Sequence, residues 1–171
     1  MSEVESEELV DQVCTCATLR RATRAVTQLY DLVLAPTKLR ATQFIILKSI
    51  REAGEIAQCK YAKDNGIAVE TLSRRFGGLR KKGFLEMRVG AHGEHLYALA
   101  PKGEQVFLKA LPYWQRAQAR LKSRLGEDDW HAVLKLCDRV WHAAHQAEQF
   151  RTKNALQMSS ERASVLASAA D

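Results

Sequence analysis

Apolar and polar residues follow a helical period along most of this chain, which predicts a mainly α-helical protein. Residues 6–35 are expected to form one long helix, because the proline that follows cannot continue it. A second helix is predicted over residues 41–53, where the apolar positions recur until a glycine ends the pattern. A short extended piece at residues 55–56 and a third helix over residues 58–64 come next.

The fourth predicted helix covers residues 69–82 and follows a turn at Asn65-Gly66. Its residues Leu72, Phe76 and Leu79 have the i, i+4, i+7 spacing of one helix face, so they are expected to be buried. The opposite face carries basic and hydroxyl side chains. The stretch TLSRRFGGLRKKGF contains five basic residues and no acidic one, so this face is a candidate binding surface.

Gly77 and Gly78 are adjacent in this helix and point outward on a helical wheel. Each weakens a helix interior by about 0.5–1 kcal/mol relative to alanine, which is a poor choice for a face that is only solvated. Two explanations fit the pair. Either the bare backbone allows another surface to approach closely, or the glycines produce a local kink near the helix end.

After this helix the hydrophobic period changes from helical to alternating. Residues 85–89 and 96–99 are strand-like runs on either side of Gly90-Ala91-His92-Gly93, which has the length and glycine content of a hairpin turn. A further helix is predicted from Pro101 to about residue 125, and a last one runs to about residue 149.

A helix–turn–helix followed by a hairpin is the winged form of a DNA-binding module. The basic helix is the second of the pair, which is the position of a recognition helix. The sequence therefore predicts a mainly α fold with a small β-hairpin wing, in which residues 41–100 bind DNA. Residues 1–171 are expected to form a single winged-helix domain whose tail, residues 150–171, is flexible.

Composition restricts the class of protein further. Hydrophobic residues make up 46% of the 171, enough for a core, and no run approaches the ~20 apolar residues of a membrane span. The acidic N-terminus lacks the apolar segment of a secretory signal, so a cytoplasmic location and no membrane association are expected. In that compartment Cys14, Cys16, Cys59 and Cys137 are expected to be free thiols.

Positive charge is concentrated in the middle of the chain. The net charge is +6, and residues 57–102 alone carry nine Lys or Arg against four Asp or Glu, an excess of five. A localised basic surface favours a polyanionic partner. A solvated charged face with no partner is the alternative.

Four stretches of this chain occur in a characteristic order: CTCATLRRATRAVTQLYD, LRATQFIILKSI, ETLSRRFGGLRKKGFLEMR and YALAPKGE. In their order and spacing, from about residue 9 to residue 148, they resemble the MarR family of bacterial winged-helix transcriptional regulators. The resemblance implies a homodimer held together by the terminal helices, residues 6–35 and 101–149. It also implies a repressor of which double-stranded DNA is the partner, with a small-molecule ligand or an oxidant altering the affinity. A symmetric dimer would bind an inverted repeat.

The resemblance places Thr71, Ser73 and Arg74 on the groove-facing part of the recognition helix. Arg74 could pair with a guanine or hold a phosphate. Arg75 follows them but lies nearer the buried side of the helical wheel, where a surface ion pair is the alternative. Ala68 stands at the helix start and can supply no side-chain cap.

Further DNA contacts are expected from the helix before the recognition helix, from the C-terminal end of the recognition helix and from the wing. The residues assigned to these places are Gln58, Lys60, Lys81, Arg88, His92 and His95. The wing reads RVGAHGEHLY, so it has one arginine at its base and two histidines near its tip. Its binding could be weak or sensitive to pH as the histidines protonate, or the histidines could have no role.

Cys16 is a candidate redox sensor. Cys16 and Tyr30 match a reactive cysteine and one of two tyrosines in the hydroperoxide-sensing branch of the family, whereas Ala41 replaces the second tyrosine. Tyr30 lies about 21 Å along the helix from Cys16, so only Tyr30 of the partner subunit could reach it. Cys16 is expected about two turns inside the helix, too deep for much help from the helix dipole, and inert packing is the alternative. Cys59 and Cys137 are expected in the core.

No motif of an enzyme is present: the sequence has no phosphate-binding loop, nucleophile elbow, zinc-protease pair or Cys-His signature. His142 and His145 have a spacing that permits metal binding, but a third ligand is not evident, so no metal and no cofactor are expected. Two alternatives to a sequence-specific regulator stay open. One is a winged-helix protein-interaction module, and the other is a low-specificity nucleic-acid binder that has lost readout through the wing.

Overall fold

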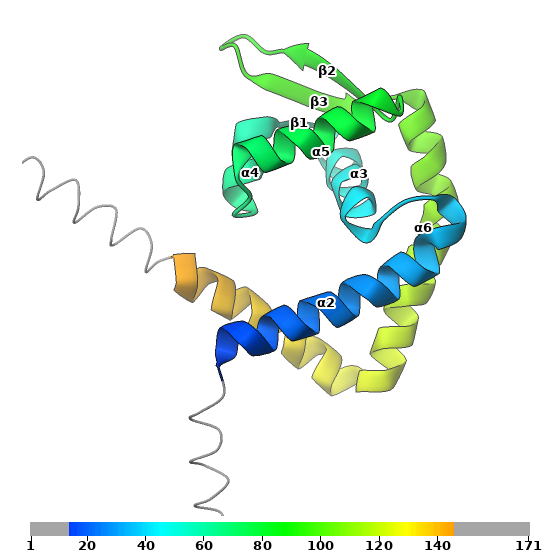
Figure 1. Cartoon of the computed structure of the whole chain (residues 1–171), viewed down its shortest axis with the longest axis vertical. Coiled ribbons are helices and arrows are strands. Elements are labelled where there is room, and N and C mark those ends of the chain that lie inside the picture. The colour runs from blue at the N-terminus through cyan, green and yellow to red at the C-terminus, as the bar shows by residue number, and fades with distance from the viewer. Residues whose placement is uncertain (1–13, 146–171) are drawn as a thin grey trace, which may run out of the picture. The chain divides into compact units, whose positions relative to one another are not determined.

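A computed structural model describes residues 14–145, most of which are helical (Figure 1). The helical elements are α2 (Thr15–Leu34), the 3-10 turn η1 (Ala35–Thr37), α3 (Ala41–Ala53), α4 (Gln58–Asp64), α5 (Val69–Lys81) and α6 (Pro101–Leu125), followed by a helix over residues 127–145. The strands are β1 (Glu55–Ala57), β2 (Leu85–Val89) and β3 (His95–Leu99). This order confirms the predicted mainly α fold with a small β wing. The parts of the first and last predicted helices at residues 6–13 and 146–149, and the tail, lie outside the described residues.

The chain divides into two compact units, residues 1–119 and residues 120–171. The first contains α2, α3, α4, α5, the strands and most of α6. The described part of the second contains the end of α6 and the helix over residues 127–145. Within this second unit Lys122 Nζ lies 2.6 Å from Glu127 Oε1 across the break between its two helices. None of the helices within residues 14–145 has the length and apolarity needed to cross a membrane.

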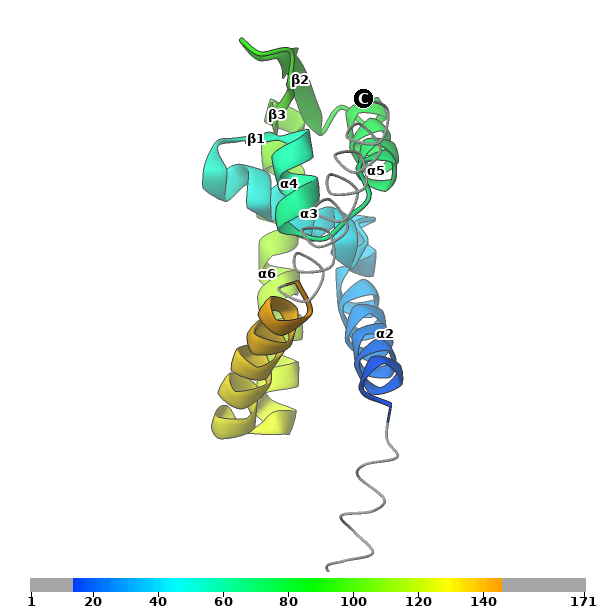
Figure 2. The same cartoon turned by 90° about the vertical axis from the view of Figure 1, so that its left-hand side faces the viewer.

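The three strands form an antiparallel sheet in the order β1-β3-β2. Residues 55–57, expected only as an extended piece, pair with β3, so that Ile56 and Met87 lie on opposite sides of Tyr97. The hairpin of β2 and β3 projects beyond the helices, at the end of the first unit farthest from the start of α2 (Figures 1 and 2). This projection gives the hairpin the position of a wing.

One face of α5 packs against the sheet and the preceding helices, as its spacing predicted. Leu72, Phe76 and Leu79 are fully buried. The ring of Phe76 packs against that of Tyr97 on β3, with 4.4 Å between the ring centroids, and also contacts Tyr61 on α4. Burying the apolar face in this way orients the basic face of α5 toward solvent.

The second half of the core joins α3 to α6. The ring of Phe44 stacks on both Phe107 and Trp114, with centroid separations of 5.2 Å and 5.7 Å. Stacked aromatic rings at such distances stabilise a packed pair beyond the apolar area they bury. Trp114 therefore packs against the core of its own chain.

The turn between α2 and α3 is held by side-chain hydrogen bonds. Asp31 Oδ1 accepts from the backbone N–H of Ala41 at 2.7 Å, which occupies a free donor at the start of α3. Asp31 Oδ2 accepts from Arg40 Nη1 at 3.0 Å. Lys38 takes up a left-handed conformation with φ of 59°, and this tight turn brings η1 beside the first turns of α6.

Candidate nucleic-acid interface

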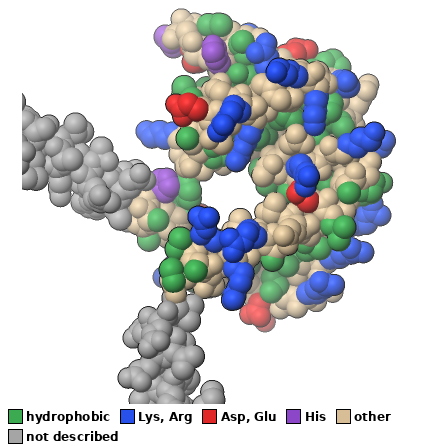
Figure 3. Space-filling model, in the orientation of Figure 1, with side chains coloured by type: hydrophobic (Ala, Val, Ile, Leu, Met, Phe, Trp, Pro, Cys, Tyr) green, Lys and Arg blue, Asp and Glu red, His purple; other side chains and the backbone are tan. Residues whose placement is uncertain are grey.

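The outward face of α5 carries the residues that the sequence assigned to a DNA groove. Ser73, Arg74 and Arg75 are exposed, and Thr71 is half-buried. Blue side chains of Lys and Arg stand out on the face of the molecule that carries α5 (Figure 3). Arg75, which the helical wheel placed nearer the core, is exposed to solvent. It forms no ion pair with another residue of the described stretch 14–145.

The start of α5 is stabilised by charge and not by a side-chain cap. Ala68 makes no side-chain hydrogen bond to the helix, as expected. Glu70 lies in the first turn, where a negative charge interacts favourably with the helix dipole. Arg74 Nη2 donates to Thr71 Oγ1 at 3.3 Å, one turn earlier on the same face. The guanidinium is therefore held over the N-terminal half of α5 without the loss of its solvent exposure.

Gln58 differs from its expected position as a surface contact to the DNA backbone. Its side chain is 5% exposed and lies between α4, α5 and the sheet. Gln58 Nε2 donates to Ser73 Oγ at 2.5 Å, and Gln58 Oε1 accepts from the Tyr97 hydroxyl at 3.1 Å. A buried amide needs partners for both its groups, and these two bonds provide them. Gln58 therefore acts on the exposed face through Ser73.

This chain of hydrogen bonds determines how Ser73 can bind. The serine oxygen accepts from Gln58, so the hydroxyl hydrogen is left to donate outward. On DNA the acceptors for such a donor are phosphate oxygens and the exposed N7 and carbonyl oxygens of bases in the major groove. The Ser73 hydroxyl therefore keeps its hydrogen for a further acceptor.

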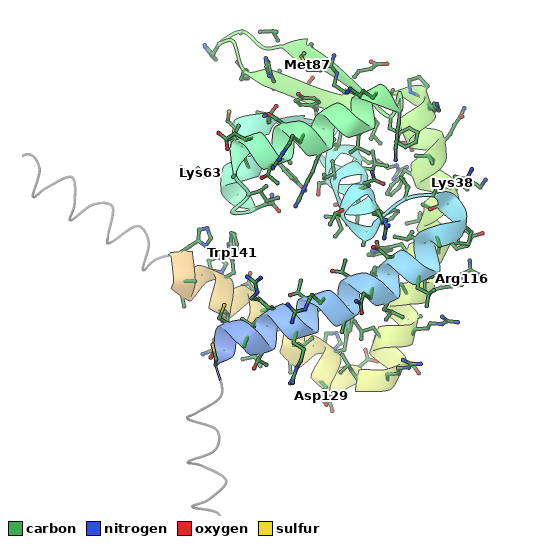
Figure 4. The ribbon with its side chains drawn as sticks, in the orientation of Figure 1. Lys38, Lys63, Met87, Arg116, Asp129 and Trp141 are labelled. Atoms are coloured by element: carbon green, nitrogen blue, oxygen red, sulfur yellow. The ribbon has the colours of Figure 1, made fainter. Side chains whose placement is uncertain are left out.

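The glycine pair lies within one unbroken helix. α5 continues from Val69 to Lys81 through Gly77 and Gly78, and a Cβ built on either glycine meets no atom within 4 Å. A groove of about 720 Å³ lies beside Gly77, between α5 and β2, with Met87 of β2 on its other side (Figure 4). An unbroken helix with open space at both glycines favours the close-approach explanation over the kink.

The wing is tied to the edge of the sheet through Arg88. Arg88 Nε and Nη2 donate to the two carboxylate oxygens of Glu55 at 2.7 Å and 2.6 Å. Arg88 on β2 pairs with Leu96 on the central strand β3, and Glu55 on β1 pairs with Ala98. The two side chains therefore meet across the central strand. A guanidinium has five N–H donors, so three are left for another acceptor. Arg88 therefore holds the wing in place and retains donors for a phosphate.

The remaining predicted contacts are at the surface. Lys81 is exposed at the end of α5, and His92 and His95 are exposed at the wing. Lys60 is also exposed, and its Nζ lies 2.6 Å from Asp64 Oδ2 on the same helix. An exposed ion pair of this kind contributes little to stability, so Lys60 can exchange the aspartate for a phosphate at little cost.

No protein-family model matches this sequence, and no curated protein matches it. Among solved structures the chain is similar to the M. tuberculosis transcriptional regulator MosR in complex with DNA, with 31% sequence identity and a TM-score of 0.72. The match covers 79% of this chain and 98% of MosR. The chain belongs to the MarR family of winged helix-turn-helix transcriptional regulators. It is accordingly a DNA-binding transcriptional regulator and not an enzyme.

Two further structures share the fold of this MarR-family chain. One is a mutant MarR from E. coli complexed with operator DNA, at 22% identity and a TM-score of 0.66, with 72% of this chain and 91% of that chain covered. The other is BpsR from Bordetella bronchiseptica, whose DNA binding is regulated by 6-hydroxynicotinic acid. Its identity is 20% and its TM-score 0.65, over 74% of this chain and 93% of BpsR. At these identities the likeness shows the fold alone.

The cysteines of this MarR-family regulator are more exposed than expected. Cys59 and Cys137 were predicted in the core, but both are exposed. Cys59 lies on the solvent side of α4, and Cys137 belongs to a stretch, residues 131–144, of which every residue is exposed. Cys16 is exposed too, and it is the second residue of α2, whereas the sequence placed it about two turns inside a helix. Backbone N–H groups in a first turn lack helical partners, and the dipole there favours negative charge.

Tyr30, the predicted companion of Cys16, faces the first unit's own α6. Its hydroxyl donates a hydrogen bond to Gln118 Oε1, and partial burial raises the pKa of the Tyr30 phenol. A neutral hydroxyl with a fixed acceptor aligns α2 with α6. Tyr30 therefore does not contact Cys16 of the same chain, in agreement with the separation along α2.

The histidine pair of the last helix has other neighbours. His142 Nδ1 lies 3.5 Å from Asp138 Oδ2, and the ring of His145 packs on Trp141 with 3.8 Å between centroids. Within residues 14–145 no three His, Cys, Asp or Glu side chains gather in a way that could hold a metal ion.

Sequence reasoning missed two residues that support the interface, Tyr97 and Glu55. Tyr97 carries the hydrogen-bond chain to Ser73, and Glu55 holds Arg88. A signal existed for Tyr97, since a buried tyrosine normally requires a partner for its hydroxyl. Nothing local marked Glu55, because its contact with Arg88 depends on the pairing of β1 with β3.

Proposed function

We propose that this chain binds an inverted-repeat DNA site as a homodimer, places α5 in the major groove and represses transcription. The wing of β2 and β3 would follow the backbone beside it. Arg74 and Ser73 are the proposed base-reading residues, with Thr71 and Arg75 beside them. The proposed phosphate contacts are Lys60, Lys81, Arg88, His92 and His95. The proposed location of this regulator is the cytoplasm, because that compartment contains the bacterial chromosome.

The observation that carries this proposal is the division of α5 into two faces. The apolar residues Leu72, Phe76 and Leu79 are fully buried, so the polar face is presented by a rigid support. Ser73 is oriented from behind by Gln58, and Arg74 by Thr71. Side chains held in position before binding lose less freedom on binding, which favours recognition of a defined sequence.

A second copy of the chain is the proposed partner of the last helix. Within residues 127–145 an apolar stripe is exposed in the single chain, and it consists of Val133, Leu134, Leu136, Val140 and Trp141. Residues three and four apart share a helix face, so these side chains form one contiguous surface. An exposed apolar stripe of this kind is typical of an interface between protein chains.

Cys16 is the proposed point at which an oxidant acts. It is exposed, and it lies in the first turn of α2, where negative charge is favoured. Oxidation of an accessible thiol adds a polar group at the start of α2. We infer that this change weakens DNA binding by altering the packing of the terminal helices between the two copies.

Selection of bound fragments from genomic DNA with the purified full-length chain tests the main proposal. The expected product is an inverted repeat with half-site centres about 10 base pairs apart or a multiple of that, protected symmetrically in a footprint. Binding to it should fall steeply as salt rises, because phosphate contacts release counterions. Equal binding to random duplex would support a low-specificity binder, and absence of DNA binding at low salt would support a protein-interaction module.

A further inference from the structure

The first half of α2 carries a basic surface that is separate from the candidate DNA interface. Arg20, Arg21 and Arg24 are exposed there, and within residues 14–145 none of them belongs to an ion pair. We propose that the acidic segment before α2, residues 1–11, binds this arginine face in its own chain, and that the bound segment keeps nucleic acid away from the face. The second statement rests on the proposed function, whereas the first does not.

The three arginines lie on one side of α2. Successive residues of a helix turn by about 100°, so positions 20, 21 and 24 fall within an arc of about 100°. The opposite side carries Leu19 and Val33, which are half-buried. α2 has no acidic residue before Asp31, whose carboxylate already binds Arg40 and the N–H of Ala41. Like charges one turn apart repel each other, so the arginine face favours an acidic partner from outside α2.

The arginine face lies away from the wing. The hairpin of β2 and β3 is at the end of the first unit farthest from the start of α2 (Figures 1 and 2). Lys and Arg side chains nevertheless gather over the first half of α2 as well as over α5 (Figure 3). A basic surface attracts nucleic acid through the phosphates without regard to sequence. An uncovered arginine face would therefore compete with recognition of an operator by α5 and the wing.

The segment before α2 has the complementary charge. Residues 1–11 contain no basic residue, and their acidic residues are Glu3, Glu5, Glu7, Glu8 and Asp11. A run of acidic residues of this kind is typical of a segment that binds a basic surface. Its five negative charges are enough to neutralise the three arginines, so the segment can cover the whole arginine face.

The connection between the acidic segment and α2 is long enough for the two to meet. α2 begins at Thr15, and the backbone of Cys14 before it is extended, with φ of −65° and ψ of 110°. An extended residue directs the chain away from the helix axis, so the residues before it can fold back along the side of α2. From Cys14 back to Glu8 the chain spans up to about 20 Å, whereas Arg20 and Arg24 lie about 9 and 15 Å along the helix. A tether this short gives an effective concentration in the millimolar range, so a few exposed ion pairs are sufficient for binding.

Carbodiimide cross-linking of the full-length chain tests the docking without DNA. The variant Arg20→Lys/Arg24→Lys keeps both positive charges, and each introduced amine can be joined to a carboxylate that lies against it. We expect peptides that join position 20 or 24 to residues 3–11, in a product that keeps the mass of one chain. Ala22→Lys is the control, because it places an amine on the other side of α2 at an exposed position equally close to the segment along the helix. The control should cross-link to the segment about fivefold less or lower still, because the tether alone does not select a side of the helix.

Salt and the mass of the product complete this test. In about 1 M salt, where the Debye length is about 3 Å, the cross-links should be lost, because exposed ion pairs hold the segment in place. Cross-links that persist in salt, or that form equally in Ala22→Lys, would show that the tether alone brings the groups together and would overturn the docking. Cross-links found only in a product of twice the mass, or only to Asp128 and Asp129 of the second unit, would assign the face to another occupant and overturn it as well.

The effect on nucleic acid has a separate readout, the affinity for random duplex. Glu7→Gln/Glu8→Gln should bind random duplex about threefold more tightly than the parent or better, because the arginine face becomes accessible to phosphates. The control Asp128→Asn/Asp129→Asn removes the same charge at exposed positions of the second unit and should bind like the parent. Adding Arg20→Gln/Arg24→Gln to Glu7→Gln/Glu8→Gln should remove the gain.

The outcomes separate the two statements from each other and from the proposed function. Equal affinity for random duplex in the two acidic variants, or a gain that persists without the two arginines, would refute the protection from nucleic acid and leave the docking standing. If no operator is bound at all, the proposed function fails, while cross-linking still decides the docking.

Discussion

Gln58 Nε2 donates a hydrogen bond to Ser73 Oγ at 2.5 Å, so a residue buried on α4 fixes a hydroxyl on the exposed face of α5. Tyr97 completes the chain by donating to the other end of the same amide. The helix-turn-helix is therefore joined to the wing strand β3 by polar bonds as well as by packing. Changes at a position that cannot touch DNA should alter DNA recognition.

Replacement of Gln58 by leucine should reduce sequence discrimination. The variant keeps the bulk of the side chain but removes the hydrogen bond to the Ser73 hydroxyl. It also leaves the buried Tyr97 hydroxyl without an acceptor, which should lower the free energy of unfolding by about 1–3 kcal/mol. Fluorescence anisotropy with selected and random duplex should show the specific affinity falling more than the non-specific one. Ser73→Ala should then have less effect in the Gln58→Leu background than in the parent, because coupled residues are not additive. Strictly additive effects would show that Gln58 does not act through Ser73.

Arg74→Ala should weaken binding to the selected operator by about 1–3 kcal/mol if the guanidinium reads a base edge. Lys81→Ala is the comparison, because Lys81 is exposed at the end of the same helix and is assigned to phosphate. It should cost less, act on all sequences alike and reduce the salt dependence. Unchanged operator affinity in Arg74→Ala would mean that α5 is not the recognition helix.

Gly78→Ala should separate stability from DNA binding. A Cβ at this position meets no atom within 4 Å, so alanine should raise the free energy of unfolding by about 0.5–1 kcal/mol. If the bare backbone serves close approach to DNA, the same variant should bind the operator more weakly while it melts at a higher temperature. Tighter or equal operator binding would remove the functional explanation of the glycine pair.

Val133→Asp should disrupt the proposed homodimer, because it places a charge in the apolar stripe of the last helix. Lys135→Asp is the matched control, since position 135 lies about 200° around the helix from position 133 and faces away from the stripe. Sedimentation at micromolar concentration should show a dimer for the parent and the control and a monomer for Val133→Asp. A dimer in all three would place the interface elsewhere.

Organic hydroperoxide should release the parent from its operator through Cys16. Cys14→Ser should respond like the parent, because Cys14 precedes α2 and serine suits the start of a helix. Cys16→Ser should keep its operator affinity after treatment, and the mass of the Cys16 peptide in the parent should increase. Equal binding before and after oxidation in all three proteins would leave Cys16 without a regulatory role.

The sequence by itself determined most of the described helices, the hairpin of β2 and β3 and the buried face of α5. The bounds of residues 41–53 and 58–64 were obtained from it without error, since hydrophobic period, glycine and proline act within a few residues. Most of the candidate DNA contacts on α5 also proved to be at the surface, because they lie away from the buried face of Leu72, Phe76 and Leu79.

Only the tertiary structure decided which polar groups meet. Gln58 is buried because β3 supplies Tyr97 and α5 supplies Ser73, partners 39 and 15 residues away in the sequence. Arg88 finds Glu55 because β1 and β2 flank the same central strand. Cys59 has the apolar character of a core residue but falls on the solvent side of α4. Periodicity shows how residues are arranged within one element, whereas a hydrogen bond or an ion pair depends on the packing of several.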